Sequence, residues 1–295
     1  MSSTQYDAVL GVIGGSGVYQ VEGVEAVAEH ALETPFGPPS DAVVETRISG
    51  RTVFFLPRHG RGHRYLPSEV NYRGNVHALK QLGVTHVLAV SAVGSMREEI
   101  RPGHMVVPDQ LFDRTKGVRP STFFGEGIAG HVVFADPFCD ELRGVALDAA
   151  RACEAQVHDG GTYVCMEGPQ FSTRAESHFY RGAVDASVIG MTGLPEAKLA
   201  REAEMCYAML AMSTDYDCWH EEEEDVSVEA VLAVLKANAE MANAIVKKTA
   251  ELLPATTSCP CLEAARYAVI TAPEAIAPEA KERLKMLYGR YWEGA

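Results

Sequence analysis

Short apolar runs rich in β-branched residues recur along the chain, and small or polar residues follow each of them at once. Runs of this kind are typical of buried strands in an α/β sheet. The five runs span residues 8–13, 52–56, 85–90, 187–189 and 206–212. We therefore predict that these segments are strands of one sheet.

Segments with helical character lie between and after the apolar runs. Their ranges are 69–82, 138–155, 173–182, 196–205, 227–253 and 278–292. Pro195 suits the first turn of the fourth segment, and Ser227 suits the N-cap of the fifth. We predict one α/β domain over residues 1–253. A proline-rich stretch then leads into a C-terminal extension, residues 254–295, whose short helix packs on the same domain or on a neighbouring subunit.

Composition and charge narrow the class of protein. The 295 residues are 47% hydrophobic and 22% charged, which is ordinary for a globular protein. The net charge of −14 disfavours nucleic acid and an anionic membrane surface as partners. No apolar run reaches about 18 residues, so no membrane-spanning helix is expected. The first basic residue is Arg47 and the seven cysteines are an odd number, so neither a secretory signal nor a disulfide framework is indicated. We predict a cytoplasmic protein.

The residues that follow the strands carry the candidate chemistry. In an α/β sheet, ligands bind beyond the carboxyl ends of the strands. Glycine, hydroxyl, basic and acidic residues gather at five such ends, in ranges 14–17, 57–60, 91–95, 190–193 and 213–217. We predict a site assembled from these distant parts of the chain.

The first two strand ends suit an anion. The glycine-rich segment 14–17 offers backbone amides and the Ser16 hydroxyl, although a plain tight turn explains it as well. It lacks the lysine of a Walker loop and the full dinucleotide-binding spacing. Arg58 can contact phosphate with two N–H groups, and His59 stands beside it. A surface salt bridge and a solvated histidine are the alternatives.

Asp215 and Asp217 are the most specific feature. Residues two apart in an extended segment point the same way, so we expect the two carboxylates on one side. Each charge raises the pKa of the other carboxyl, and burial raises it further. A carboxyl kept protonated near neutral pH can donate a proton. A calcium site or a helix N-cap is the alternative, but no further oxygen ligand has the spacing that calcium requires.

Two other features are assigned no catalytic role. The acidic run 221–225 is interpreted as a solvated approach to a helix, whose dipole favours negative charge there. Cys259 and Cys261 flank a proline, and without a matching second pair of ligands a zinc site is disfavoured. A disulfide between them remains open. We predict no metal.

Taken together, the strand ends resemble the purine nucleoside phosphorylase family, in particular the branch that acts on S-methyl-5′-thioadenosine. The matching segments are 11–19, 34–41, 56–80, 91–103, 167–177, 190–208 and 213–219, in family order. The resemblance implies a single α/β domain whose mixed central sheet is partly closed into a barrel and flanked by helices. It also implies a homotrimer, no cofactor, and inorganic phosphate as co-substrate.

The resemblance also implies a role for each matching residue. The implied roles are phosphate binding for Ser16, Arg58, His59, Thr192 and the Ala92 amide, ribose binding for Met191, purine binding for Phe171, Asp215 and Asp217, contact with the methylthio group for Val228 and Val231, and a contribution to the neighbouring subunit's site for His131.

The reaction implied is phosphorolysis of methylthioadenosine to adenine and 5-methylthioribose 1-phosphate, a salvage reaction. Asp215 would protonate purine N7, and Asp217 would accept from the 6-amino group. An alternative is a phosphorylase of 6-oxopurine nucleosides such as inosine or methylthioinosine. Gly193 keeps this alternative open, because the same Met-Thr-Gly segment also occurs in relatives that act on 6-oxopurines. A nucleosidase that uses water and a non-catalytic nucleoside-binding module are further alternatives. Some heat-tolerant relatives carry Cys-x-Cys tails, which hints at a disulfide here.

Overall fold

Strand β6 (His86–Ser95) is the branch point of an eleven-stranded mixed sheet. The computed structural model describes residues 4–15, 24, 26–220 and 228–292. In it, β6 pairs in parallel with a strand on each side, and its last two residues pair with a third, antiparallel strand. Three series of paired strands therefore start at β6. The first is β2 (Leu10–Gly14), β5 (Arg51–Pro57), β4 (Val43–Ile48) and β3 (Ala26–His30). The second is β12 (Cys206–Asp215), β7 (Met105–Val107) and β9 (Val157–Asp159), and the third is β11 (Ala186–Gly190), β10 (Thr162–Met166) and β8 (Gln110–Arg114).

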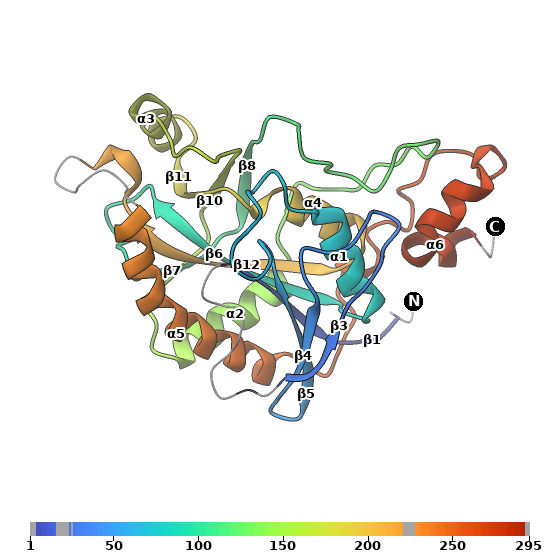
Figure 1. Cartoon of the computed structure of the whole chain (residues 1–295), viewed down its shortest axis with the longest axis horizontal. Helices are drawn as coiled ribbons and strands as arrows, with labels where there is room; N and C mark the ends of the chain where they lie inside the picture. Colours follow the sequence, from blue (N-terminus) through green and yellow to red (C-terminus); the bar gives the residue numbers. More distant parts are fainter. Residues whose placement is uncertain (1–3, 16–23, 25, 221–227, 293–295) are drawn as a thin grey trace.

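Helices cover both faces of the central strands (Figure 1). Successive residues of a strand face opposite sides, so Val87 and Ala89 join one core while Leu88 and Val90 join the other. The first core is shared with α1 (Tyr72–Gln81), α4 (Gly193–Glu202) and α6 (Pro278–Trp292), and the second with α2 (Asp140–Ala152) and α5 (Val228–Leu252). A third, smaller core lies under α3 (Arg174–Gly182).

Helix α3 shows how local sequence fixes an element near the site. Thr173 accepts from the Glu176 amide through its hydroxyl, and the Glu176 carboxylate accepts from the Thr173 amide. This reciprocal cap satisfies two amides that the first turn would otherwise leave without partners. The helix start is thereby fixed next to η1 (Asp217–Trp219).

The C-terminal residues pack against the same α/β core. Strand β13 (Thr256–Thr257) pairs with β1 (Tyr6–Asp7), so the extension lies beside the start of the chain. After η2 (Pro260–Glu263) and η3 (Pro273–Ala275), α6 buries Leu284, Leu287 and Tyr288 in the first core. Figure 1 shows α6 and both chain ends at the same side of the molecule.

Most of the predicted elements are present. All five apolar runs form strands, and the single α/β domain with a mixed sheet and flanking helices is confirmed. β6 and β12 continue through the polar residues that we took for strand ends. The remaining strands were missed because they are short or only partly buried; β3, for example, is mostly exposed.

The predicted helices differ from the structure mainly at their ends. Helix α4 begins at Gly193, three residues before the predicted start, and α1 begins at Tyr72 rather than at residue 69. The proposed cap Ser227 lies outside the described residues. Among the described residues, no helix combines the length and the apolar character needed to cross a membrane.

The packing of α6 can be tested by shortening one buried side chain. Leu284 is fully buried in the first core, so Leu284→Ala is expected to lower the free energy of unfolding by about 2–5 kcal/mol. Urea unfolding measures the change. The exposed neighbour Lys285 provides the matched control, and Lys285→Ala is expected to stay within about 0.5 kcal/mol of the parent. Equal effects of the two variants would contradict the packing of α6 on the core.

Candidate active site

A cavity of about 330 Å³ lies at the carboxyl ends of the central strands. This volume is within the range of small-molecule sites, about 300–1,000 Å³. Residues from all five predicted strand ends line it. They are Gly15; Arg58 and His59; Ser91, Ala92, Val93 and Gly94; Gly190, Met191 and Thr192; and Thr214, Asp215 and Asp217.

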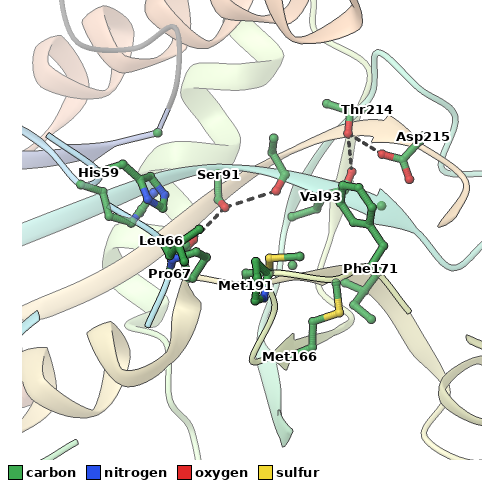
Figure 2. A pocket seen from close by; sticks show the side chains of 18 of the residues that line it. His59, Leu66, Pro67, Ser91, Val93, Met166, Phe171, Met191, Thr214 and Asp215 are labelled. Atoms are coloured by element: carbon green, nitrogen blue, oxygen red, sulfur yellow. Dashed lines mark hydrogen bonds between the residues drawn. The ribbon is translucent and has the colours of Figure 1, made fainter. Parts of the chain in front are cut away.

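The cavity has two chemically different ends. Figure 2 shows His59 and Ser91 on one side, Asp215 and Phe171 on the other, and Met191 between them. One end therefore offers an imidazole, hydroxyls and a guanidinium, and the other offers two carboxyls and an aromatic wall.

Arg58 is buried at the end of β5 and is largely committed to the protein. Nε and Nη2 donate to the two carboxylate oxygens of Glu196. Nη1 donates to Val90 O at 3.0 Å and Nη2 donates to Ile13 O at 3.3 Å. A guanidinium has five N–H groups, so a single one, on Nη1, is left for a ligand. That nitrogen lies beside Gly15, where an added Cβ would be 3.6 Å from it.

The Glu196 carboxylate also balances the charge of Arg58. Burial alone would lower the pKa of the guanidinium, but Glu196 raises it, so Arg58 remains charged. Because the pair is neutral as a whole, this end of the cavity is less cationic than the sequence suggested.

His59 is a neutral acceptor in this geometry. Its Nδ1 lies 2.8 Å from Tyr65 O, which can only accept, so Nδ1 carries the proton and Nε2 keeps its lone pair. The ring stacks on His63 with centroids 4.3 Å apart. Burial, together with the charge of Arg58, lowers the pKa of His59 to about 4. His59 can therefore accept a hydrogen bond from a ligand hydroxyl at neutral pH.

Two hydroxyls stand between His59 and the middle of the cavity. Ser91 Oγ and Thr192 Oγ1 are 3.0 Å apart, and Ser91 Oγ also lies 3.4 Å from Ala92 O. When Ser91 donates to Thr192, the Thr192 hydroxyl proton is left for a ligand. Ala92 follows in β6 and lines the same wall.

The middle of the cavity, at Met191, is held by a second buried ion pair, between Arg119 and Glu167. Arg119 donates to Glu167 and to the backbone oxygens of Met191, at 2.6 Å, and Leu194, at 2.8 Å. Met191 lies against Gly168, where an added Cβ would be 2.5 Å from its sulfur. The position of Met191 is thus fixed from two sides.

Asp215 ends β12 in a buried position, where its Oδ1 accepts from the Asp217 amide at 2.8 Å. Thr214 Oγ1 lies 2.7 Å from Asp215 Oδ2 and 3.1 Å from Val93 O (Figure 2). The hydroxyl has one proton and Val93 O only accepts. Both contacts are made at once when Thr214 donates to Val93 and a protonated Asp215 donates to Thr214. Burial raises the pKa of Asp215, assisted by the charge of Asp217, and outweighs the hydrogen bonds from Thr214 and the Asp217 amide, which act to lower it.

Asp217 is oriented differently from the prediction. Its φ of 53° places it in a left-handed turn, so the two aspartates do not share an extended segment. They approach each other because Gly94 leaves room: a Cβ there would be 2.9 Å from Asp215 Oδ1 and 3.4 Å from Asp217 Cβ. Ser177 Oγ donates to Asp217 Oδ2 at 2.5 Å, and burial is the main cause that raises the pKa of Asp217.

Of the remaining predicted residues, Phe171 alone lines the described cavity. Ser16 lies outside the described residues, and so do the side chains of Val228 and Val231 in the first turns of α5. Phe171 lines the cavity and is 45% exposed. His131 is exposed, and its amide donates to Ala268 O in the extension. Within one chain, the structure does not bring His131 to the cavity.

Sequence reasoning missed the residues that hold these side chains in place. They are Glu196, which binds Arg58; Thr214, which binds Asp215; Ser177, which binds Asp217; and Arg119, which fixes Met191. Glu196 could have been found from the sequence. It is a single acid in an apolar segment, and a buried carboxylate there needs a partner. Thr214 is the sequence neighbour of Asp215, but the other three residues are far in sequence from the side chains that they hold.

The described residues contain one group suited to a metal ion, and it lies outside the cavity. Cys139, Cys206, Cys259 and Cys261 come together with all four sulfurs within 4.8 Å of one another. The sequence argument against zinc assumed that Cys259 and Cys261 lack a second pair of ligands. That assumption was wrong, because the fold supplies Cys139 and Cys206.

Comparisons with known proteins show the family of the chain. The profile of the phosphorylase superfamily matches residues 9–251. The chain is 55% identical to the S-methyl-5′-thioadenosine phosphorylase of Geobacter sulfurreducens, over 97% of this chain and 99% of that protein. It is 53% identical to the protein of that name from Chloroflexus aurantiacus, over 97% and 99%.

Solved structures give the same result. A methylthioadenosine phosphorylase from an antarctic soil metagenomic library superposes with a TM-score of 0.88 at 47% identity, covering 95% of this chain and 99% of that one. A variant of the adenosine/methylthioadenosine phosphorylase of Schistosoma mansoni, solved with methylthioadenosine, has a TM-score of 0.79 at 37% identity, over 83% and 91% of the two chains.

The protonation state of His59 is directly measurable. We expect its ring to titrate near pH 4 in the folded protein, against an ordinary value of 6.5. In the unfolded chain His59 takes up a proton near pH 6.5, but in the folded protein it does so only near pH 4. As the pH falls from 6.5 to 4, protonation therefore favours the unfolded chain, and the free energy of unfolding decreases. NMR titration measures the midpoint, with the signal assigned by its loss in His59→Gln. A midpoint at or above the ordinary value would contradict the neutral acceptor.

Proposed function

The chain belongs to the phosphorylase superfamily, and from that membership and the cavity we propose that it catalyses phosphorolysis of S-methyl-5′-thioadenosine. The products are adenine and 5-methylthioribose 1-phosphate. One observation supports the proposal: the cavity places anion-binding groups, a fixed methionine and a buried carboxyl of raised pKa one after another (Figure 2). When phosphate attacks a nucleoside at C1′, the phosphate, the ribose and the purine are arranged in space in the same order.

The purine lies at the carboxyl end, against Phe171. The C1′–N9 bond breaks through an oxocarbenium-like transition state, and its electron pair passes into the purine. Asp215 donates its proton to N7, which makes adenine a neutral leaving group. The Thr214 hydroxyl, 2.7 Å away, can then turn from Val93 O and donate to the new carboxylate. Thr214 therefore stabilises Asp215 in both protonation states.

Asp217 selects the base. Ser177 already donates to Oδ2, which leaves Oδ1 to accept from the 6-amino group of adenine. A 6-oxo group offers no proton there and is repelled by a carboxylate. Sites that depend on such a hydrogen bond discriminate by up to about 10⁴–10⁵-fold, and this favours adenine nucleosides over inosine.

The phosphate lies at the opposite end of the cavity. It takes the remaining N–H of Arg58, the hydroxyl proton of the Ser91–Thr192 pair, and the amides of Ala92 and the Ser16 segment. Its own hydroxyl donates to Nε2 of His59, so the nucleophile at neutral pH is hydrogen phosphate dianion. Held beside C1′, the dianion stabilises the developing positive charge and then attacks that carbon.

The resemblance to the family supports the assignments for the rest of the nucleoside. Met191 supports the ribose. Val228 and Val231, in the first turns of α5, are assigned to the methylthio group. His131 is assigned to the site of a neighbouring subunit in a homotrimer. An apolar pocket excludes an added hydroxyl by only about 10²-fold, so adenosine is the secondary substrate.

The first experiment is chromatography of methylthioadenosine incubated with the protein, with and without phosphate. Adenine and a sugar phosphate are expected only with phosphate, with slower turnover of adenosine and little of inosine. Adenine released without phosphate would indicate a nucleosidase. Turnover of inosine in preference to methylthioadenosine would contradict the role of Asp217, and binding without turnover would indicate a nucleoside-binding module.

The acid role of Asp215 predicts the effect of one substitution. Asp215→Asn keeps the shape but cannot protonate N7, so kcat is expected to fall by about 10²–10⁴-fold. Because the protonated form is the active one, kcat of the parent should fall as the pH rises through the raised pKa of Asp215, and the variant should lack that limb.

An exposed aspartate gives the matched control for this variant. Asp148 is 70% exposed and pairs only with Arg151, so Asp148→Asn is expected to keep both the rate and the pH profile. An Asp215→Asn protein with near-parental kcat would rule out the proton donation.

A further inference from the structure

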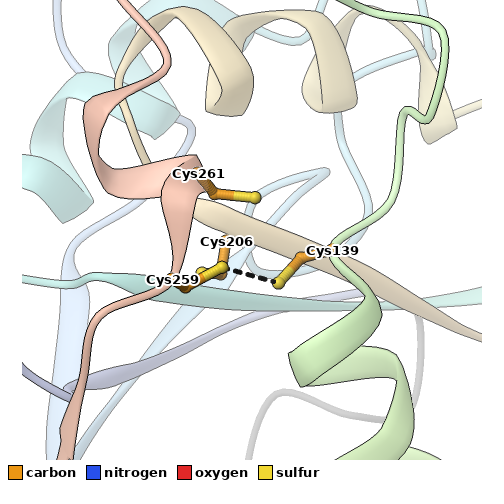
Figure 3. Close-up of side chains that lie close together, drawn as sticks. All are labelled: Cys139, Cys206, Cys259 and Cys261. Atoms are coloured by element: carbon orange, nitrogen blue, oxygen red, sulfur yellow. Dashed lines mark hydrogen bonds between the residues drawn. The ribbon is translucent and has the colours of Figure 1, made fainter. Parts of the chain in front are cut away.

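Four of the seven cysteines meet at one point, away from the cavity (Figure 3). Cys139 precedes the first turn of α2, Cys206 begins β12, and Cys259 and Cys261 lie at the start of η2. All four Sγ atoms lie within 4.8 Å of one another, and those of Cys139 and Cys259 are 3.6 Å apart. None of the four lines the catalytic cavity.

The spacing of the sulfurs fits a shared central ion. Zinc–sulfur bonds are about 2.3 Å, and four sulfurs at the corners of a tetrahedron of that size are about 3.8 Å apart. The 3.6 Å contact is close to this edge length, and the outer limit of 4.8 Å needs only small side-chain shifts. Cys139, Cys206 and Cys259 are buried and Cys261 is half-buried, which is typical of a closed structural site.

We propose that Cys139, Cys206, Cys259 and Cys261 form a structural zinc site with four thiolate ligands. Four soft sulfur ligands in a compact cluster select zinc among the common divalent ions. They also fill the tetrahedral coordination, so no position stays open for substrate or water. The site is therefore structural and does not depend on the proposed reaction.

The surroundings supply a route for the ion and support for the ligands. A second cavity, of about 420 Å³, is lined by Cys139, Cys259 and Cys261. Its charged lining consists of three acids, Asp136, Asp140 and Glu141, and one base, Arg201, so on balance it attracts a cation. Thr257 accepts from the Cys259 amide at 3.0 Å and donates to Glu141 at 2.7 Å. Such contacts orient the ligand segment before the ion binds.

The position of the site gives it a stabilising role. Cys139 and Cys259 are separated by 120 residues, and the ion would tie the C-terminal extension to α2 and β12 at once. Each thiol that binds releases its proton to solvent. Because the unfolded chain does not hold the four thiols together, the binding free energy adds to the free energy of unfolding.

Metal content and the cobalt spectrum test the proposal. The full-length protein, purified under reducing conditions, is expected to hold one zinc ion per chain by mass spectrometry of the metal. Replacement of zinc by Co²⁺ is expected to produce the visible bands of tetrahedral cobalt thiolate. Removal of the ion by a chelator is expected to lower the midpoint of thermal unfolding.

Cysteine variants locate the ion. Cys261→Ser, at the half-buried ligand, is expected to lose the zinc, whereas Cys153→Ser, a cysteine outside the cluster, is expected to retain it. If Cys261→Ser fails to fold, the zinc content and cobalt spectrum of the parent protein still decide the question.

Two results would overturn the site. The first is a reduced protein that contains no zinc, binds none when Zn²⁺ is added, and presents seven reactive thiols. The second is an intact mass lower by two hydrogens together with a mapped disulfide among the four cysteines in the protein as isolated. That outcome would mean that the cluster is an oxidised cross-link.

Discussion

The buried ion pair between Arg58 and Glu196 is the contact on which the site depends. Arg58 extends from the end of β5 and donates to the backbone oxygens of Ile13 in β2 and Val90 in β6. Glu196, in α4, also accepts from Tyr207 of β12. One guanidinium and one carboxylate therefore connect four strands and a helix. A buried charge left without its partner destabilises a fold by about 3–5 kcal/mol, so the pair has no conservative replacement.

Two aspartates in the same cavity acquire different chemistry from their neighbours. Asp215 accepts from the Asp217 amide, and its other oxygen contacts a threonine hydroxyl whose single proton can be given to Val93 O instead, so that side of Asp215 can carry a proton. Asp217 instead accepts from Ser177, which supports a charged carboxylate. Burial raises the pKa of both groups, but the hydrogen bonds separate their roles: one carboxyl is suited to donate a proton and the other to accept a hydrogen bond.

The sequence predicted which strands bear the site but not how the side chains are held. Continuous apolar runs marked the central strands, because both their faces are buried. Edge strands such as β3 lack that signal. The turn at Asp217 and the partners of Arg58 depend on segments far apart along the chain, and hydrophobic periodicity carries no information about such pairs. The same limit hid the two cysteines that meet Cys259, one of them 120 residues away.

Helix α4 connects the cavity to the C-terminal extension. At one point it holds Arg58 through Glu196, and at its end the Glu202 backbone oxygen accepts from Tyr288 of α6 at 3.1 Å. Just beyond the helix, the buried carboxylate of Glu204 accepts from Arg290. The described part of the extension lines none of the catalytic cavity. Within one chain, the extension therefore acts on the site through packing, because it contacts the helix that positions the Arg58 guanidinium.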